Sequence, residues 1–583
     1  MIAVLKSGMV ASLQGIITPS ASRPFKGGPM HSKLSAMWHS KRGRQWREYL
    51  TAYLMLAPSV ILIFTFGIFP VLFAVYVSLH RWRIRMGKFV GLAHYVRAVE
   101  SLGFLLFFAV ALGMFFAAWR AWRAVMTHAR ENEESPWLWG VPGVVLGVGG
   151  LLWMRYGVIL LPVVLEIPNK AIGVKRSQAL FRKLLWEAFI EPHVLAAMGV
   201  AAGVTLVGLL LWWALYRRQS SARHSTYILQ WSTGVFFFLT GVITAGFTYH
   251  QLQLTIQKAI EEGEPPTIAT HVVLITIGVI LFYAAWRLWQ SAVDSASDKG
   301  FAFKGLAALF LLVAGWIFVA ELPPVIEAGD PDLWRGLVVT VYYALGTVPF
   351  QLGIALVLSY LLFQNIRGRE FFRVLYFMPY ITPTVASAAV FRLLFIGHPS
   401  GLVNRFLRLF GIKPLKWLWE PRGVFSLIAD GLGVHIPSWA AGPSLALVVI
   451  IIYSIWTYVG YDTVIYLAGL GNIPNEINEA AEIDGASRWQ IFRHITLPLL
   501  SPTTYFLSLI AIIGTFKAFN HIYVMRETEA LKTVNTFSVV IFDTFFTDTR
   551  YGYASAMAFV LFAIILSLTY INNKVQGSRV FYQ

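Results

Sequence analysis

Long apolar runs alternate with short polar connectors along almost the whole chain. Most runs hold about as many residues as a helix needs to cross a hydrocarbon core of about 30 Å. The clearest runs lie near 52–79, 102–119, 139–162, 193–216, 227–249, 269–289, 303–321, 335–363, 443–468, 499–524 and 552–573. Because a segment in lipid must satisfy its own backbone hydrogen bonds, the pattern predicts an all-α polytopic membrane protein.

Composition agrees with a membrane location. Of the 583 residues 57% are hydrophobic and only 13% are charged, which is too apolar for a soluble globule of this length. The formal net charge is +18, but the basic residues lie in short runs between apolar segments, as the positive-inside rule requires. We therefore expect a multi-pass protein of the inner (cytoplasmic) cell membrane, surrounded by lipid bilayer, and no nucleic-acid partner.

Both ends of the chain carry basic flanks. Residues 1–50 are polar, and basic side chains crowd just before the first apolar run at Lys41, Arg42, Arg44 and Arg47. That run is too long for the apolar core of a signal peptide and no small-residue cleavage site follows it, which predicts a retained span. A short tail with Lys574 and Arg579 follows the last run. The charges predict that both termini are cytoplasmic.

The stretch EAAEIDGASRWQIFRHITLP is the longest clearly polar segment in the C-terminal half. It is typical of two short amphipathic helices. The apolar residues that share a face are Ile477, Ala480 and Ala481 in the first helix and Trp489, Phe492 and Ile495 in the second. Gly485 can adopt the left-handed conformation that ends the first helix, Ser487 can cap the second, and Pro498 can open the next span. The stretch is predicted to form an elbow at the membrane surface.

The same stretch resembles the EAA motif, the signature cytoplasmic loop of permease subunits in binding-protein-dependent ABC importers of the maltose-type, carbohydrate-uptake family. The candidate loop covers 476–498, and its key residues are Glu479, Ala480, Ala481, Asp484, Gly485, Ala486, Arg488, Phe492, Ile495, Leu497 and Pro498. In that family the loop docks into a groove on the ATPase subunit and transmits its closure to the membrane. The other interpretation is a solvated connector between two spans, which would not need this spacing of Gly and Pro.

The resemblance implies partners: ABC ATPase subunits, a second permease subunit and an extracytoplasmic solute-binding protein. The sequence contains no GxxxxGK[ST] phosphate loop, so we expect ATP hydrolysis in a partner and a transport subunit that is not itself an enzyme. Without cysteine, disulfides, thiolate metal sites and cysteine nucleophiles are excluded. We expect no catalytic residue, no metal site and no cofactor.

The family's core is interrupted in this chain. Residues 51–98 hold the first span and FVGLAHYVRAV, which is similar to the external segment after span one in sugar permeases. The start of the second span, DLWRGLVVTVYYALG, appears only at Asp332. We therefore predict a six-helix type I permease core, 51–98 and 332–583, with an inserted segment, 99–331, of about six additional transmembrane helices. An even number of inserted spans keeps the candidate loop on the side of the N-terminus.

One loop of the inserted segment contradicts the charge rule. Five basic residues would face outward, namely Lys170, Lys175, Arg176, Arg182 and Lys183. Either the run near 139–162 crosses the membrane cleanly, or the stretch around Arg155 is a re-entrant or interfacial segment. Because the inserted spans have almost no ionisable residue at their centres, we predict that the segment is peripheral to the translocation path. The alternative is an extra substrate-binding or regulatory unit.

In the sugar branch of the family, spans four and five line the central cavity. On that resemblance, the candidate substrate contacts are Trp456, Tyr458, Gly460, Tyr461, Asp462, Thr463, Phe516, Lys517 and Asn520. Aromatic rings beside Asp, Thr and Asn can stack on a sugar ring and hydrogen-bond its hydroxyls. An ionisable group at membrane depth usually faces a cavity or a partner, which favours Asp462 and Lys517. Lys517 could instead extend to a membrane interface.

These observations favour the membrane-spanning subunit of an ATP-driven importer for a sugar or oligosaccharide. An ABC permease for a different solute is a rival, because the candidate loop is shared across many substrates. A rival from another class is a secondary transporter of about twelve spans. It would need no ATPase-docking loop, and it would be favoured by ion-coupling carboxylates within spans, of which the sequence has few.

Overall fold

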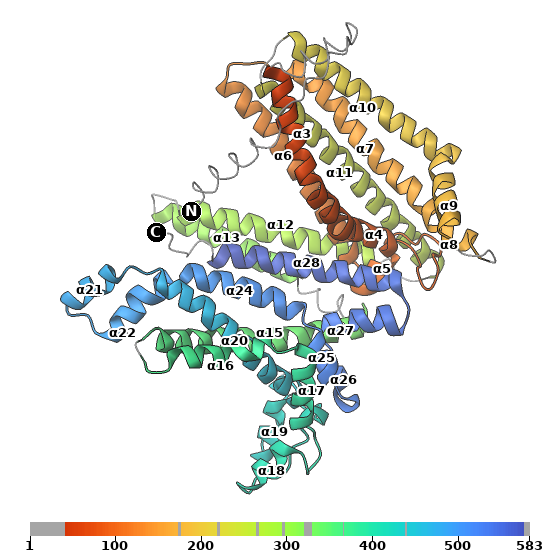
Figure 1. Cartoon of the computed structure of the whole chain (residues 1–583). Coiled ribbons are helices and arrows are strands. Elements are labelled where there is room, and N and C mark those ends of the chain that lie inside the picture. Colours follow the sequence, from red (N-terminus) through yellow and green to blue (C-terminus); the bar gives the residue numbers. More distant parts are fainter. Residues whose placement is uncertain are drawn as a thin grey trace, which may run out of the picture. The chain divides into compact units, whose positions relative to one another are not determined.

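The computed structural model describes residues 41–172, 177–218, 222–263, 267–293, 298–319, 329–364, 366–437 and 440–576. Most of the predicted N-terminal segment, together with Lys175, Arg176 and Arg579, lies outside these residues. The chain divides into two units, Met1–Ala74 and Val75–Gln583, and each is described by itself. The described residues are mostly helical, with turns and irregular loops between the helices, and they contain no β-strand, only isolated bridges (Figure 1).

The first predicted span is one helical stretch. It consists of α3 (Lys41–Ile63), a π-helical turn η1 (Phe64–Ile68) and α4 (Phe69–Ser78), and its apolar part covers Glu48–Ser78. The run predicted near 52–79 is therefore helical as expected. The segment that follows it, which the sequence predicts to be external, contains α5 (Ala93–Val99).

Helices occupy all six apolar runs predicted in the inserted segment. They are α6 (Leu102–Glu131), α7 (Trp137–Leu165), α8 (Ile167–Lys170), α9 (Gln178–Ile190), α10 (Pro192–Arg218), α11 (Ala222–Glu261), α12 (Thr267–Val293) and α13 (Asp298–Val319). In α13 the stretch Phe303–Gly315 is a shorter apolar helix, whereas α6, α7, α10, α11 and α12 are long enough to cross a membrane. Helix α7 runs unbroken through Arg155 and is long enough to cross a membrane. Helix α9 was not expected from the sequence.

Close helix contacts in the inserted segment depend on small residues. Helix α11 packs against α6 and α7, α7 also packs against α10, and α12 pairs with α13. Where α7 meets α11, a Cβ atom on Gly143 would collide with the Cβ atom of Trp231, and one on Gly147 would lie 2.8 Å from the carbonyl oxygen of Ser232. Two glycines four residues apart thus allow the two backbones to approach closely, as in many membrane helix pairs.

The rest of the chain forms the predicted core. Its elements are α15 (Pro331–Phe363), α16 (Arg369–Ile381), α17 (Thr384–Leu394), α18 (Leu402–Arg408), η2 (Trp417–Trp419), α19 (Val424–Gly431), α20 (Leu445–Gly471), α21 (Asn475–Ile483), α22 (Arg488–Ile491), η4 (Phe492–Thr496), α23 (Leu497–Leu499), α24 (Ser501–Phe516), α25 (Asn520–Met525), η5 (Thr528–Ala530), α26 (Leu531–Val534), α27 (Phe537–Phe542), η6 (Asp543–Thr547) and α28 (Tyr551–Gln576). In its most apolar stretch α20 is 61% buried, against 28% for α15 and for α28. Helix α20 is therefore the central helix of the core.

Two pairs of consecutive helices in the core are bent. Helices α16 and α17 meet at 94°, and the helix Arg488–Leu499 meets Ser501–Phe516 at 60°. At the first bend Thr382 is extended and Pro383 follows it, because the proline ring disfavours helical conformation in the residue before it. Among the described residues, nine helices could cross a membrane, or eleven if each bent pair is one span.

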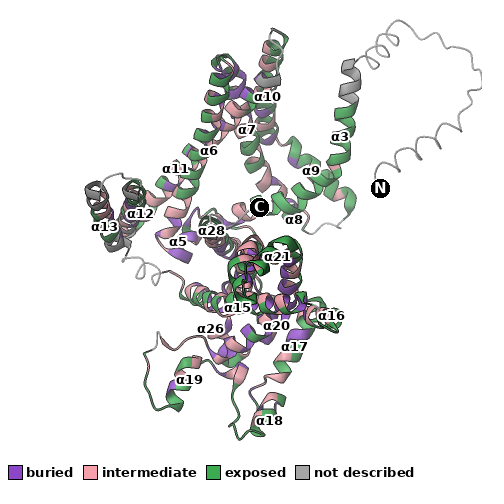
Figure 2. Cartoon of the chain, turned by 90° about the vertical axis from the view of Figure 1, so that its left-hand side faces the viewer, coloured by how far each residue is buried: buried purple, intermediate pink, exposed green. Residues whose placement is uncertain are grey.

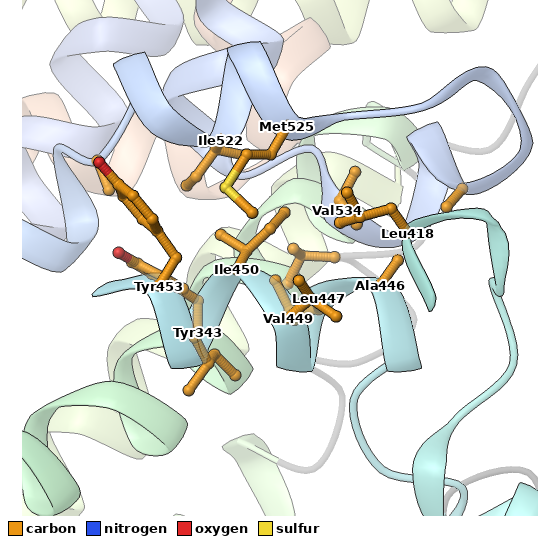
Figure 3. Close-up of a cluster of buried hydrophobic side chains, with 14 of the residues drawn as sticks. Tyr343, Leu418, Ala446, Leu447, Val449, Ile450, Tyr453, Ile522, Met525 and Val534 are labelled. Carbon is orange, nitrogen blue, oxygen red and sulfur yellow. The ribbon is translucent and has the colours of Figure 1, made fainter. Parts of the chain in front are cut away.

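A buried cluster joins the core helices near α20. Figure 3 shows Ile450 and Tyr453 of α20 packed with Tyr343 of α15 and with Ile522 and Met525 of α25. All five side chains are almost completely buried. The cluster fixes how α15, α20 and α25 are rotated against one another.

The two ends of the inserted segment meet at one point. The backbone N–H of Asp330 lies 3.4 Å from the carbonyl oxygen of Ala98, and the hydroxyl of Tyr553 on α28 donates to Asp330 Oδ2 at 2.6 Å. The guanidinium of Arg97 lies 4.9 Å from the centre of the Tyr553 ring. The chain therefore leaves the core and returns to it at the same place beside α28.

Candidate coupling loop and translocation cavity

The first helix of the candidate loop ends at a glycine in the left-handed conformation. Gly485 has a φ of +80°. Its N–H donates to the carbonyl oxygen of Glu482 at 3.0 Å, and the N–H of Ala486 donates to that of Ala481 at 2.9 Å. This pair of bonds is the Schellman arrangement, which satisfies the last carbonyls of α21. The predicted role of Gly485 as the joint is confirmed.

The second helix of the loop begins with a capping box. The hydroxyl of Ser487 accepts from the backbone N–H of Gln490 at 3.4 Å, and the side-chain oxygen of Gln490 accepts from the backbone N–H of Ser487 at 2.7 Å. The helix continues through η4 and α23, in which Pro498 is the second residue. The predicted cap is confirmed, whereas the next span starts at Ser501, after the 60° bend.

Aromatic contacts anchor the second helix to the core. The ring of Phe492 stacks on Trp489 with centroids 5.6 Å apart and meets Tyr360 of α15 edge-on at 4.8 Å. Ile491 is buried beneath the loop. Helices α21 and α22 project at one end of the core helices (Figure 1). The elbow is thus attached to α15 as well as to the spans that precede and follow it.

The rest of the loop exposes apolar and charged side chains together. Ile483 is 86% exposed and Trp489 is 65% exposed. The predicted loop residues that are exposed are Glu479, Ala480, Asp484, Gly485, Arg488 and Leu497, and those that are partly buried are Ala481, Ala486, Phe492, Ile495 and Pro498. An exposed apolar patch rimmed by charges is typical of a protein interaction site.

A cavity of about 140 Å³ lies between α15, α16, α20 and α24. Three predicted substrate contacts line it, namely Tyr458, Tyr461 and Asp462. The ring of Tyr461 stacks on Tyr380 of α16, with centroids 4.7 Å apart. The cavity therefore has an aromatic wall beside a carboxyl group.

Unpaired polar atoms point to a ligand or water in this cavity. Asp462 Oδ2 and Thr347 Oγ1 are buried and have no hydrogen-bond partner within the described part of the chain. Gln351, only 4% exposed, lines the same space. Buried polar groups are nearly always hydrogen-bonded, so these atoms need a partner that enters the cavity. Sugar hydroxyls have the donors and acceptors to pair with all three.

Three predicted residues of α20 lie outside the cavity. Trp456 packs on Phe391 of α17, with ring centroids 5.0 Å apart. Gly460 lets α16 approach, since a Cβ atom there would collide with the carbonyl oxygen of Tyr376. Thr463 is buried and donates to a carbonyl of its own helix. These residues support the packing of α20.

The three predicted residues after Thr515 also lie outside the cavity. Phe516 is buried in a cluster with side chains of α28. Lys517 ends α24 and Asn520 begins α25, and both side chains are exposed. Their side chains do not line the cavity, although those of their neighbours Thr515 and His521 do.

Sequence reasoning missed a hydrogen-bonded group beside the cavity. The hydroxyl of Tyr343 lies 2.7 Å from Ser454 Oγ and 2.9 Å from His521 Nε2. Tyr343 and His521 also line the cavity, with Thr347 and Gln351. Polar residues within apolar spans were the available signal. The sequence did not show which of them share a face of the bundle.

Comparisons with known proteins assign the family. Residues 336–579 match the family described as binding-protein-dependent transport system inner membrane component. The chain is 34% identical over 258 residues to a probable ABC transporter permease protein, YesP, of Bacillus subtilis (strain 168). This alignment covers 44% of this chain and 76% of that protein. It is 30% identical over 256 residues to the lactose transport system permease protein LacF of Rhizobium radiobacter, covering 43% of this chain and 78% of that protein.

A solved structure also matches part of the chain. The crystal structure of a bacterial alginate ABC transporter in complex with an alginate pentasaccharide-bound periplasmic protein is 21% identical, with a TM-score of 0.36, over 46% of this chain and 92% of that chain.

The fold and the relatives define a membrane transport component that is not an enzyme. The chain belongs to the family of ABC importer permeases, the inner-membrane components of binding-protein-dependent transport systems. It is a multi-pass inner-membrane protein with an all-helical permease fold.

Proposed function

We propose that the chain carries a sugar or oligosaccharide across the inner membrane. An extracytoplasmic binding protein delivers the solute, a second permease subunit completes the path, and partner ATPases engage the loop 476–498. The observation that carries the proposal is the cavity beside α20, where Tyr461 and Tyr380 face the buried carboxyl of Asp462. Similarity to a lactose permease supports the same substrate class.

The charge of the cavity favours a neutral solute. Among the described residues that line it, Asp462 is the one carboxyl group, no Lys or Arg is present, and the basic group is the imidazole of His521, which is hydrogen-bonded to Tyr343. A phosphorylated or carboxylated solute would therefore meet a carboxyl group and no Lys or Arg to pair with, which is unfavourable in a buried site. Hydroxyl groups can donate to that carboxyl group, and an apolar ring face can stack on the tyrosines.

Reconstitution tests this function. The chain, its second permease, ATPase and binding protein would be placed in proteoliposomes with ATP inside, and uptake of labelled neutral sugars and of sugar phosphates would be measured. We expect uptake of a neutral sugar that requires both ATP and the binding protein. Uptake driven by an ion gradient without ATP would indicate a secondary transporter, and uptake of only a charged solute would overturn the sugar assignment.

We further propose that the N-terminus, the loop 476–498 and the C-terminus share the cytoplasmic side. Basic flanks before the first span and around Arg367–Arg373 support this topology. Because the chain has no cysteine, single cysteines can be introduced by Ser40→Cys, Ser487→Cys and Ser578→Cys, of which Ser40 and Ser578 lie outside the described residues. Labelling of any of them by an impermeant reagent outside sealed cells would refute it.

The domain division is part of the proposal. Residues 1–50 form a cytoplasmic segment, and the six-span core consists of 51–98 and 332–583. The segment 99–331 is peripheral to the path. The meeting of its two ends at Asp330 and Ala98 supports this division, because such a segment can be added without separating the core spans.

A further inference from the structure

Helix α9 (Gln178–Ile190) lies between two spans without being a span itself. It follows α7 and α8 and leads directly into α10, and Ser177 caps its first turn by accepting from the N–H of Leu180 at 3.1 Å. Figure 1 shows α9 running across the ends of α7 and α10, and Figure 2 shows that most of it is exposed. The helix therefore lies at the ends of these two spans.

One side of α9 packs on the inserted segment. Ala188 is buried together with Val163 and Ile167 of the preceding helices and Val194 of α10, and Leu184 packs against the same cluster. These contacts fix how α9 is rotated about its axis.

The other sides of α9 divide into an apolar and a charged flank. Trp186, Phe189 and Ile190 are 69%, 38% and 47% exposed, and their spacing of three and four places them on one flank. Arg182 precedes Trp186 by four residues and shares that flank. On the neighbouring flank of the helix, Lys183 and Glu187 form an exposed ion pair at 3.9 Å.

This arrangement matches the boundary between lipid headgroups and acyl chains. A helix that lies flat there can bury its exposed apolar flank in lipid while its charged flank stays in water. Tryptophan is enriched at this depth, and an arginine beside it can extend its guanidinium to a lipid phosphate. Water alone would solvate the ion pair but not the flank formed by Trp186, Phe189 and Ile190.

We propose that α9 is an interfacial helix that inserts Trp186, Phe189 and Ile190 into the bilayer surface and pairs Arg182 with lipid phosphate. The proposal accounts for the loop that contradicts the charge rule, because basic residues paired with headgroups can remain on the outward side. The inserted segment would then be held by lipid at this end. This inference does not depend on the solute that the permease carries.

Spin labels test the proposal on the full chain, which has no native cysteine. Trp186→Cys and Lys183→Cys would be labelled separately in nanodiscs of phosphatidylcholine and phosphatidylglycerol, with Val158→Cys, an exposed site within α7, as the lipid-facing control. At 186, as at 158, we expect collisions with oxygen to exceed those with a water-soluble nickel chelate several-fold. At 183 we expect the reverse.

Two outcomes would overturn the proposal. If the label at 186 collides with the nickel chelate as often as the label at 183 does, the apolar flank faces water. If it is shielded from both reagents once the partner subunits are added, a protein covers the flank instead of lipid. In the double variant Arg182→Gln, Trp186→Cys, we expect the label at 186 to collide measurably more often with the nickel chelate, relative to oxygen. An unchanged ratio of the two collision rates would mean that Arg182 does not contact lipid.

Discussion

The core and the inserted segment are both built from apolar helices, yet different interactions hold them together. In the core, buried polar side chains bridge helices, as Tyr343 does to Ser454 and His521. In the inserted segment, the buried hydroxyls of Thr240 and Thr248 donate to carbonyls of their own helix. A polar group between helices in a membrane is costly unless it is paired, so these bonded groups restrict how the core helices can pack.

Polar bonds between helices also occur in the inserted segment: the hydroxyl of Tyr227 on α11 donates to the carbonyl oxygen of His128 on α6 at 3.3 Å, and the indole N–H of Trp153 on α7 donates to Thr205 Oγ1 on α10 at 3.1 Å. Where α7 meets α11, the close approach depends on Gly143 and Gly147. Dispersion forces between closely packed backbones are sufficient to hold such a pair in lipid. Changes to each region test the proposal that the core transports and that the inserted segment is peripheral to the path.

The largest effect is expected at the joint of the loop. Gly485→Val places a β-branched residue at a φ of +80°, which costs about 1–3 kcal/mol of local strain and should tilt α21 against α22. We expect ATP-dependent uptake to fall to background while the spans remain inserted. Uptake in proteoliposomes and co-purification of the ATPase measure this.

Gly471→Val is the matched control, because a side chain there meets open space and no positive φ is required. Normal uptake by the Gly485→Val variant would mean that the elbow does not couple the permease to its ATPase.

The next effect concerns the cavity. Asp462→Asn keeps the volume but replaces one carboxyl oxygen with an amide N–H donor, and leaving a buried solute hydroxyl without its partner costs about 1–3 kcal/mol. We expect the substrate concentration for half-maximal uptake to rise about tenfold or more, with little change in the amount of assembled complex. Lys517→Gln, which changes an exposed residue outside the cavity, should behave as the unchanged chain. Equal effects of both substitutions would contradict the assignment of the cavity.

A smaller effect on uptake is expected where α7 meets α11. Gly143→Val would force a side chain against Trp231 and should destabilise the inserted segment by about 1–3 kcal/mol. Thermal unfolding in detergent should shift to lower temperature, while correctly inserted protein keeps its uptake rate. Gly203→Val on α10, where a side chain meets nothing within 4 Å, is the control. A loss of uptake without a loss of stability would mean that α7 takes part in transport.

The smallest effect on transport is expected from removing the inserted segment altogether. Because the N–H of Asp330 lies 3.4 Å from the carbonyl of Ala98, Val99 can be joined to Pro331 with little movement of the core. We expect the shortened chain to assemble with its partners and to retain uptake. If it assembles but no longer transports, the inserted segment belongs to the translocation path and the comparison fails.

The local features of the candidate loop could be predicted because they depend on neighbours within about one helical turn. The left-handed Gly485 and the cap at Ser487 follow from the preference of glycine for positive φ and from a hydroxyl that reaches the nearest free N–H. The positions of the spans could also be predicted, because bilayer thickness sets their length and contact with lipid requires apolar side chains.

The sequence by itself determined the helices, their approximate ends and the elbow of the loop, whereas only the tertiary structure decided which side chains meet. Helices that are apolar all round give no periodic signal of their rotation, so Tyr461 and Thr463 looked alike although only Tyr461 lines the cavity. The pairing of Tyr343 with His521, separated by 178 residues, depends on how α15, α20 and α25 are rotated in the packed core. The meeting of Ala98 with Asp330 depends on the packing of every inserted helix between them, and no local pattern records it.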